Sequence, residues 1–213
     1  LGLIGLFAGV FGTLIGAAGG FILVPILLFL YPEATPATIT SITLTVAFFS
    51  ALSGSIAYSR LRRIDYRSGL LFSLAGVPGA IIGASITGLL SRGIFQAVFG
   101  VSLLLVAGYL LLRPQRHQIG DVVKLHQTSR KIIDRDGHVF TYSFSLIRGI
   151  AISFGVGLIG GLLGIGGGIM HVPALTQVLS FPAHIAIATS NFVVAITTFA
   201  ADTVHIVSGA FTE

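Results

Sequence analysis

Long apolar stretches separated by short polar connectors make up most of the chain. The stretches lie at residues 2–30, 37–59, 68–90, 94–112, 145–180 and 184–207. Each comes close to or exceeds the about 20 mostly apolar residues that a membrane-crossing helix needs. The pattern therefore predicts an all-α, polytopic membrane protein with six spans.

Polar residues gather in one sizeable segment, residues 113–143, between the fourth and fifth spans. Within it, residues 131–142 contain Asp136-Gly137, a dipeptide typical of the tight turn between two antiparallel strands. We expect a small β-hairpin-like loop at this place.

Glycine interrupts the fifth apolar stretch. Residues 157–173 contain seven glycines, and each glycine inside a helix costs about 1 kcal/mol relative to alanine. We expect the helix to open at Gly166, Gly167 and Gly168. At membrane depth, the amide groups that an opened helix frees must face protein, water or a ligand.

The same phrase occurs earlier in the chain, at residues 9–25. When Pro25 is set over Pro173, eight of seventeen positions are identical, and the first break falls at Gly19-Gly20. Two apolar segments interrupted by Gly and Pro in corresponding halves are the best sequence indication of a transporter's binding site. The phrase therefore favours transport as the function.

The repeat divides the chain into three parts. We expect a first transmembrane repeat at residues 1–113, a cytoplasmic loop at 114–143 and a second, incomplete repeat at 144–213. The second copy stops after two spans, so the full-length protein is expected to have about two more beyond Glu213. Four spans for each copy make the repeats parallel, whereas re-entrant half-helices allow an inverted pair. The sequence leaves both arrangements open.

Close packing is the alternative explanation of the glycines. They recur at every fourth position, a spacing that lets two membrane helices approach closely without any ligand. The two ladders consist of Gly12, Gly16, Gly20 and of Gly160, Gly164, Gly168. A broken helix and tight packing are compatible with each other.

Composition supports the membrane assignment. Charged residues make up 9% of the chain, hydrophobic residues make up 54%, and the mean hydropathy is +0.99. Soluble domains carry about 25% charged residues. The chain has no cysteine, which excludes disulfides, thiol nucleophiles and thiolate metal sites.

Basic residues predict the orientation. Eleven of the twelve lie between spans two and three or between spans four and five, and only Arg92 lies elsewhere. The positive-inside rule places that face in the cytoplasm and the connectors 31–36 and 181–183 outside. The net charge of +5 is explained in this way and does not indicate nucleic acid as a partner. We expect a multi-pass protein of the inner (cytoplasmic) membrane, with the bilayer as its partner and a homo-oligomer left open.

Several phrases resemble one known family. The stretch Gly164–Pro173, the Ala188-Thr-Ser-Asn191 phrase and their weaker echoes at Gly16–Pro25 and Thr40–Thr43 resemble the TauE/SafE family of sulfite exporters. The resemblance runs through nearly the whole chain. It implies a secondary carrier for a small sulfur-containing or organic anion, such as sulfite or a sulfonate. One departure is Ala17-Ala18, where the second copy has Ile165-Gly166, so we expect the first break to be less open.

An anion carrier must neutralise negative charge inside the membrane. Residues 1–59 and 149–213 contain no Lys or Arg, so the positive ends of half-helices are the remaining source of positive potential. We expect the two breaks to face each other and to hold the anion by backbone amides, at Gly19, Gly20, Gly166, Gly167 and Gly168. Side chains that would add hydroxyl or amide donors are Ser41, Thr43, Thr189, Ser190 and Asn191. The alternative for these polar groups is a hydrogen bond to their own helix or to a neighbouring one.

Ionisable groups within spans are functional candidates by default. Asp202 and His205 are three residues apart and share a helix face, so they form either a proton relay or a structural pair near the expected cytoplasmic end of the last span. His171 lies within the second glycine phrase and is a candidate for contact with the substrate. Its counterpart in the first copy is Leu23, so the position does not require a polar group, and a structural role is the alternative. His184 is expected to be solvated at an outer connector.

Other classes of function find less support. A membrane hydrolase would have to use Ser190 and His205, which lie about 22 Å apart along one helix, and the chain has no Gly-x-Ser-x-Gly elbow. The in-span histidines are scattered, so neither a metal nor a cofactor is expected, and we expect no enzyme activity. An anion channel and a non-transporting membrane scaffold remain as alternatives.

Overall fold

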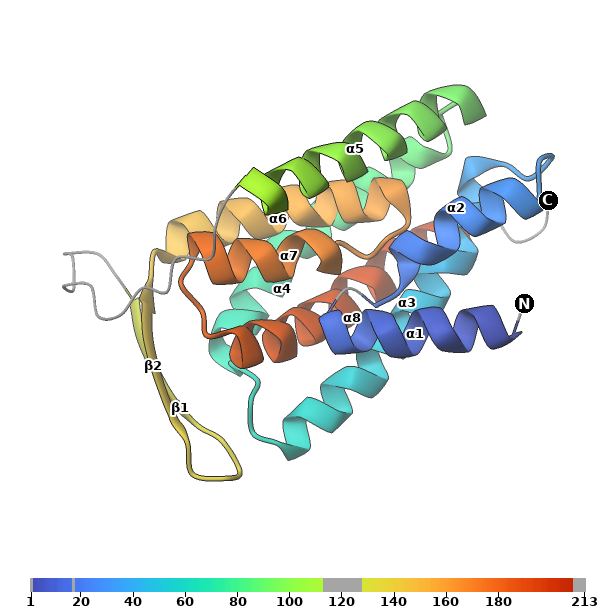
Figure 1. Ribbon diagram of the computed structural model, residues 1–213. Coiled ribbons are helices and arrows are strands. Elements are labelled where there is room, and N and C mark those ends of the chain that lie inside the picture. Colours follow the sequence, from blue (N-terminus) through green and yellow to red (C-terminus); the bar gives the residue numbers. More distant parts are fainter. Residues whose placement is uncertain (1, 17, 113–127, 209–213) are drawn as a thin grey trace.

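Helices dominate the architecture, as predicted. The computed structural model describes residues 2–16, 18–112 and 128–208 (Figure 1). The helices in this part are α1 (Gly2–Ile15), α2 (Gly20–Leu30), α3 (Pro36–Arg60), α4 (Tyr66–Thr87), α5 (Arg92–Leu112), α6 (Leu146–Leu163), α7 (Gly168–Pro173), which continues as a π-helix (Ala174–Val178), and α8 (Ala183–Val207). Five of them, α3 to α6 and α8, are long and apolar enough to cross a membrane. The all-α membrane fold is confirmed.

Local capping explains where two of the long helices begin. The side chain of Thr35 accepts a hydrogen bond from the amide of Thr38, and Pro36 occupies the first helical position of α3. The side chain of Asp65 accepts in the same way from the amide of Ser68 at the start of α4. Both helices therefore begin within two residues of the predicted spans.

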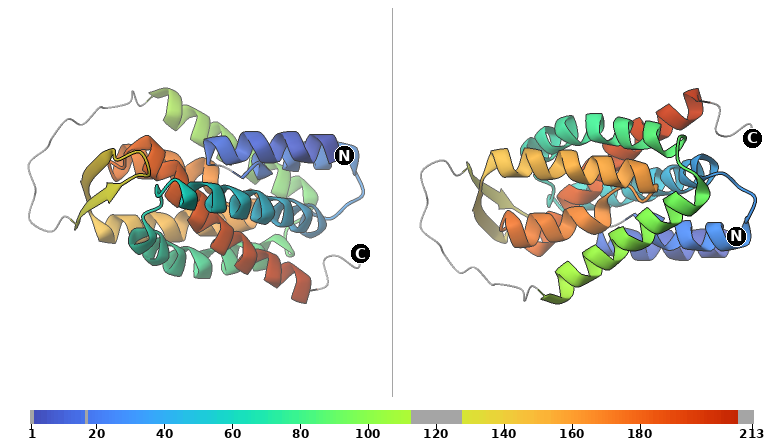
Figure 2. Two further views of the ribbon diagram at one scale, coloured as in Figure 1. Left: turned by 90° about the horizontal axis from the view of Figure 1, so that it is seen from below. Right: turned by 90° about the horizontal axis from the view of Figure 1, so that it is seen from above.

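The predicted hairpin is confirmed. Strands β1 (Thr128–Ile133) and β2 (Val139–Phe144) pair antiparallel with Thr128 opposite Phe144 and Ile133 opposite Val139. Gly137 has φ 84° in the turn, a conformation that glycine adopts without strain. Figure 2 shows this sheet across one end of the helix bundle, which we call the hairpin end. The connector 31–35 lies at the other end, the opposite end.

The first glycine phrase reverses the chain. α1 enters from the opposite end, and after Gly16 the chain turns back so that α2 returns to the same end (Figure 1). The amide of Ala18 donates to the carbonyl of Gly12 at 3.1 Å, and a β-carbon on Gly19 would meet the backbone of Ala8. The two helices therefore form a re-entrant hairpin of half-helices.

The second glycine phrase reverses the chain from the other side. α6 begins at the hairpin end beside β2, and α7 with its π-helix returns to that end, where α8 begins (Figure 1). The ring of Phe181, which follows this return, lies 4.4 Å from the ring of Tyr142 and 4.9 Å from that of Phe144, centroid to centroid. The prediction that residues 145–180 cross the membrane and that connector 181–183 faces outward is therefore wrong. Both ends of this segment lie at the hairpin end.

The two re-entrant hairpins are inverted relative to each other. Three long helices, α3, α4 and α5, lie between them, and an odd number of crossings brings the chain to the other end before the second hairpin begins. The arrangement that the sequence left open is therefore the inverted one.

The hairpins surround a central pair of helices, α3 and α8, which pack along each other. Ala47 and Ala51 of α3 and Val194 and Ala195 of α8 form a small buried cluster with Ala18 of the first turn. α4 packs on α6, where Gly157 lies against the backbone of Gly76. Small residues thus allow the close helix contacts that hold the bundle together.

The charge asymmetry agrees with the basic-face prediction. Of the nine basic residues in the described ranges, eight lie at the hairpin end and only Arg92 at the opposite end. Arg92 caps the C-terminus of α2: its guanidinium donates to the carbonyls of Leu28, Tyr31 and Ala34. A cation at a helix C-terminus is stabilised by the free carbonyls there.

Cysteine labelling tests the re-entrant second hairpin, because the chain has no native cysteine. We expect Ala183→Cys and Ser129→Cys to react with a membrane-impermeant maleimide from the same side of sealed vesicles, and Ser91→Cys from the other. All three positions are exposed. Labelling of Ala183→Cys from the side of Ser91→Cys would show that residues 145–180 cross the membrane after all.

Candidate functional site

Both glycine phrases form the same unusual turn. In the first, Gly16, Ala18 and Gly19 have φ of 80°, 53° and 77°. In the second, Gly164, Gly166 and Gly167 have φ of 71°, 70° and 77°. Three left-handed residues at matching positions end one half-helix and start the next. The first break opens in the same way as the second although position 18 is alanine, so the expected difference between them is not found.

The two turns lie against each other. A β-carbon on Gly20 would come within 2.8 Å of the α-carbon of Ile165 and 3.0 Å of the carbonyl oxygen of Gly164. A β-carbon on Gly16 would come within 2.7 Å of the side chain of Val172. The structure therefore brings the two breaks face to face at the centre of the bundle. It also packs them tightly. The glycines therefore both break the helices and allow close packing.

Each turn leaves amide groups of the described residues without a backbone partner at the start of a half-helix. Gly19 and Gly167 precede α2 and α7 with nearly identical backbone angles. Their carbonyls accept from the third and fourth amides beyond them, for example from His171 at 2.9 Å. Among the described residues, no backbone carbonyl accepts from the amides of Gly167, Gly168 or Ile169. These amides form the positive end of a half-helix.

Hydroxyl groups of each repeat flank the glycine turn of the other. Thr43 of α3 lies beside Gly164: a β-carbon there would be 2.7 Å from its Oγ1. On the other side, Ser190 Oγ of α8 donates to the carbonyl of Gly16 at 3.2 Å. Ser41 and Thr43 also donate to carbonyls of their own helix.

Asn191 is fully buried beside the first turn. Its Nδ2 donates to the carbonyls of Thr13 and Ile187 at 3.3 and 3.1 Å. Its Oδ1 has no hydrogen-bond partner among the described residues. A buried polar atom without a partner is costly, and because Oδ1 is an acceptor it suits a hydrogen-bond donor and not an anion.

Thr189 lies away from the turns. Its Oγ1 accepts a hydrogen bond from the backbone amide of Asp65 at 3.1 Å, at the hairpin end of the bundle. The side chain connects α8 to the start of α4 and does not reach the glycine turns through any hydrogen bond of the described residues.

His171 points away from the paired turns as well. Its ring packs edge-on against Phe72 of α4, and Nε2 lies 3.3 Å from Ser153 Oγ of α6. Nδ1 has no partner among the described residues. These contacts place the imidazole between α4 and α6, within the helix packing of the second hairpin.

Asp202 and His205 contact α3 and do not bond each other. Thr45 Oγ1 donates to both carboxylate oxygens of Asp202, at 3.2 and 3.1 Å, and His205 Nε2 lies 3.3 Å from Thr40 Oγ1. Because α3 begins at the opposite end, both side chains lie near that end. The prediction that they lie near the end with the basic loops is wrong, since the second hairpin does not cross.

The same reversal moves His184 to the hairpin end, where it is exposed. The two residues of the possible hydrolase pair, Ser190 and His205, lie on one unbroken helix, α8. Ser190 bonds the first glycine turn and His205 contacts Thr40. The two side chains do not form a dyad.

The sequence did not indicate the role of Asp65, a buried carboxylate at the hairpin end. Asp65 accepts hydrogen bonds from Ser68 Oγ at 2.5 Å and from the hydroxyl of Tyr142 at 2.8 Å, and Arg130 Nε lies 3.8 Å away. Burial, together with the neighbouring Asp65 carboxylate, raises the pKa of Tyr142 above its ordinary value. The network ties β1 and β2 to α4, and nothing in the local sequence indicates these long-range partners.

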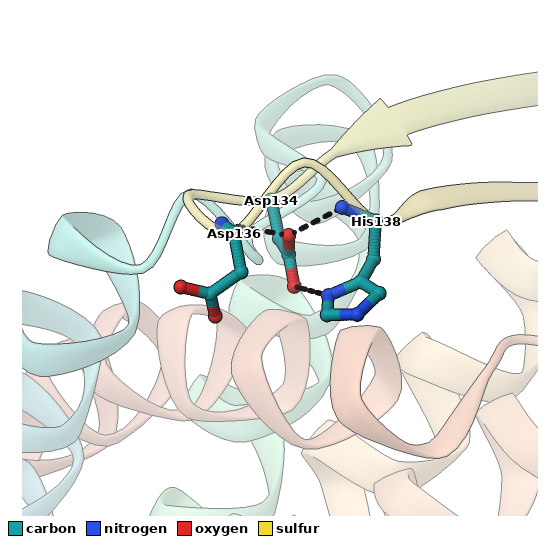
Figure 3. A group of neighbouring side chains, drawn as sticks. All are labelled: Asp134, Asp136 and His138. Atoms are coloured by element: carbon teal, nitrogen blue, oxygen red, sulfur yellow. Dashed lines mark hydrogen bonds and ion pairs between the residues drawn. The ribbon is translucent and has the colours of Figure 1, made fainter.

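The turn of the β-hairpin holds Asp134, Asp136 and His138 close together (Figure 3). Burial disfavours the charged carboxylate of Asp134, but hydrogen bonds from the amides of His138 and Asp136 and from Arg63 lower its pKa below the ordinary value. Arg63 lies 3.1 Å from Asp134 and 3.5 Å from Asp136. Arg63 thus supplies a cation to both carboxylates, and the ion pairs fasten the loop after α3 to the sheet.

Comparison with known proteins gives a family. The family model described as sulfite exporter TauE/SafE matches residues 1–213. The probable membrane transporter protein YunE of Bacillus subtilis is 37% identical over 97% of this chain and 77% of its own length. A probable membrane transporter protein of Haemophilus influenzae is 31% identical over 81% of this chain and 59% of its own length. No solved structure matches.

The contact between the two turns can be tested by adding one carbon atom. In Gly20→Ala the new methyl group meets backbone atoms at Ile165 and Gly164, so the turns must separate, and such overpacking costs about 1–3 kcal/mol. We expect a clearly lower thermal unfolding temperature in detergent.

The matched control is Gly100→Ala on α5, where an added β-carbon meets no atom within 4 Å. It should be neutral or slightly stabilising, because alanine favours a helix over glycine. Equal stability of both variants would contradict the packed turns.

Proposed function

The chain belongs to the sulfite exporter TauE/SafE family, and on that basis we propose that it acts as a secondary carrier for a small sulfur-containing or organic anion, such as sulfite or a sulfonate. The relatives are named as probable membrane transporters, and the fold is that of a polytopic membrane protein. A transporter role rests on this family membership. The class of anion is the finer step of the proposal.

The substrate site in this proposal lies between the two glycine turns. Its main support is that both turns start a half-helix at the same place, at Gly19-Gly20 and at Gly167-Gly168. The free amides and helix dipoles there favour a negative charge. Within the described helices of the bundle interior no Lys or Arg competes for this role. Thr43, Ser190 and Asn191 lie beside the turns. Their donors bond backbone carbonyls in this structure and would have to turn toward an anion when the glycine turns separate.

The inverted hairpins suggest how access alternates. The turns touch in this structure, so an anion between them requires that they separate. Because one hairpin enters from each end, retreat of α1–α2 would open the site toward the opposite end, and retreat of α6–α7 toward the hairpin end. Inverted repeats with broken helices at a central site are the usual construction of such carriers. The alternatives are an anion channel and a non-transporting scaffold.

Loss of one hydroxyl group tests the site. Thr43→Val keeps the shape of the side chain and removes the hydroxyl group beside Gly164, which donates to its own helix here and would turn to a bound anion. A hydrogen bond to a charged ligand contributes about 1.5–3 kcal/mol, so we expect at least a tenfold loss of sulfite or sulfoacetate flux in proteoliposomes, with unchanged membrane insertion. Thr203→Val is the matched control, because Thr203 also donates to its own helix but is exposed on α8, whereas Thr43 is buried beside Gly164.

The dependence of wild-type flux on anion concentration distinguishes a carrier from a channel and from a scaffold. Saturation and competition between anions are expected of a carrier. Flux that rises linearly with concentration would indicate a channel, and no flux with any of sulfite, thiosulfate, sulfoacetate or a short carboxylate would leave a scaffold. Equal flux of Thr43→Val and Thr203→Val in an active protein would reject the site but not the transport function.

Coupling to protons would use Asp202 and His205. Both are buried, at 8% and 1% exposure, and each contacts a threonine of α3, the helix that also carries Thr43. A proton on either group would therefore alter contacts between the two central helices. This supports a coupling role. The alternative is that the same contacts only hold α3 and α8 together.

Asp202→Asn distinguishes coupling from structure. Asparagine still accepts the hydrogen bond from Thr45 but no longer titrates. We expect the variant to lose anion accumulation driven by a pH gradient, while exchange of labelled anion at equal pH on both sides continues. Accumulation equal to that of the wild type would leave Asp202 a structural residue.

A further inference from the structure

Beside the sheet, at the hairpin end, lies a cavity of about 480 Å³ that the transport proposal does not use. It opens between the start of α4 and strand β1. Its lining residues are Ile64, Asp65, Tyr66, Arg67, Ser129, Arg130, Lys131 and Ile132. Three of these eight residues are cationic, which makes the cavity a candidate for an anionic ligand.

The positive charge of the cavity is only partly neutralised. Arg130 lies 3.8 Å from the buried carboxylate of Asp65, which also takes hydrogen bonds from Ser68 and Tyr142. Among the described residues, no carboxylate lies within ion-pair distance of Arg67 or Lys131. Asp65 already caps α4, so the cations themselves, and not the helix amides, supply the positive charge of the cavity.

The cavity continues into a surface that faces lipid. Tyr66, Leu70 and Leu74 follow one another at four-residue spacing on α4, and they are 48%, 52% and 72% exposed. In a spanning helix such a stripe contacts acyl chains. Tyrosine is also typical of the depth where headgroups meet the hydrocarbon region. The cationic cavity therefore lies at the head of an apolar stripe, at the boundary of the membrane.

From this arrangement we infer that the cavity binds the phosphate-bearing headgroup of an anionic phospholipid. Arg67 of α4 and Lys131 of β1 hold the phosphate between the helix and the sheet, and the acyl chains lie along Leu70 and Leu74. A soluble anion would use the cations but would gain nothing from the stripe. Basic pockets on the cytoplasmic side of membrane proteins recognise anionic lipids by the same chemistry. The bound lipid would connect the β-hairpin to α4, next to the contact between Asp65 and Thr189 of α8.

Native mass spectrometry of the whole chain in detergent tests the inference. Phosphatidylglycerol and phosphatidylcholine with the same acyl chains are added separately to the wild type and to Arg67→Gln/Lys131→Gln. We expect phosphatidylglycerol to be retained over phosphatidylcholine by the wild type. Each cation near a membrane surface changes affinity about fivefold, so the double variant should lose about 25-fold.

The control variant is Arg135→Gln/Arg148→Gln, which removes two exposed cations from the same end but none from the cavity. It should retain phosphatidylglycerol as the wild type does. Equal losses in both double variants, or no preference between the two lipids, would overturn the proposal. If the cavity double variant does not fold, Lys131→Gln alone should show the fivefold loss, and an unchanged affinity would overturn the proposal as well.

A competition experiment with inorganic phosphate distinguishes a lipid ligand from a soluble anion. Inorganic phosphate at the concentration of the lipid should not displace phosphatidylglycerol, because it lacks the contacts of the acyl chains. Displacement at equal concentration would assign the cavity to a free oxyanion and would contradict the lipid site. Neither result depends on transport, so the carrier proposal stands or falls separately.

Discussion

A backbone amide or carbonyl inside a membrane needs a partner, and this structure depends on how two chain reversals meet that requirement. A helix that stops within the bilayer leaves several such groups without their usual partners. Here each reversal uses left-handed residues at three matched positions, so that carbonyls at the end of one half-helix accept from the turn itself, as Gly160 does from Ile165 and Gly166. Hydroxyl and amide groups from the central helices serve others, as Ser190 does for Gly16. The amides that remain are those to which we assign the anion in the proposed function.

Packing around the reversals links the two repeats. The turn of the first hairpin rests on α8, which belongs to the second repeat, and the turn of the second hairpin rests on Thr40 and Thr43 of α3, which belongs to the first. α3 and α8 pack along each other between them. A displacement of either hairpin therefore acts on the helix that supports the other, which is the mechanical coupling that a carrier with one central site requires.

Local signals in the sequence predicted the helices and strands well. They predicted poorly whether the chain crosses the bundle or turns back at a glycine break. Apolar runs separated by polar connectors defined the long helices, and Asp136-Gly137 defined the hairpin. The glycines at 164–168 identified the break but not its geometry, because a helix that resumes forward and one that turns back have the same composition. That ambiguity misplaced connector 181–183 and, with it, the end at which Asp202 and His205 lie. The contacts of Asp65 with Thr189 and Tyr142 join residues 124 and 77 positions apart, a separation at which a single sequence carries no signal.

The three long helices between the reversals have an evolutionary consequence. Insertion or deletion of a single crossing helix in that interval would deliver the second reversal to the same face as the first, and the two glycine turns could no longer meet. Change in this interval is therefore tolerated only two helices at a time. Homologous chains of different length should keep an odd number of helices there, and their added segments should gather outside it.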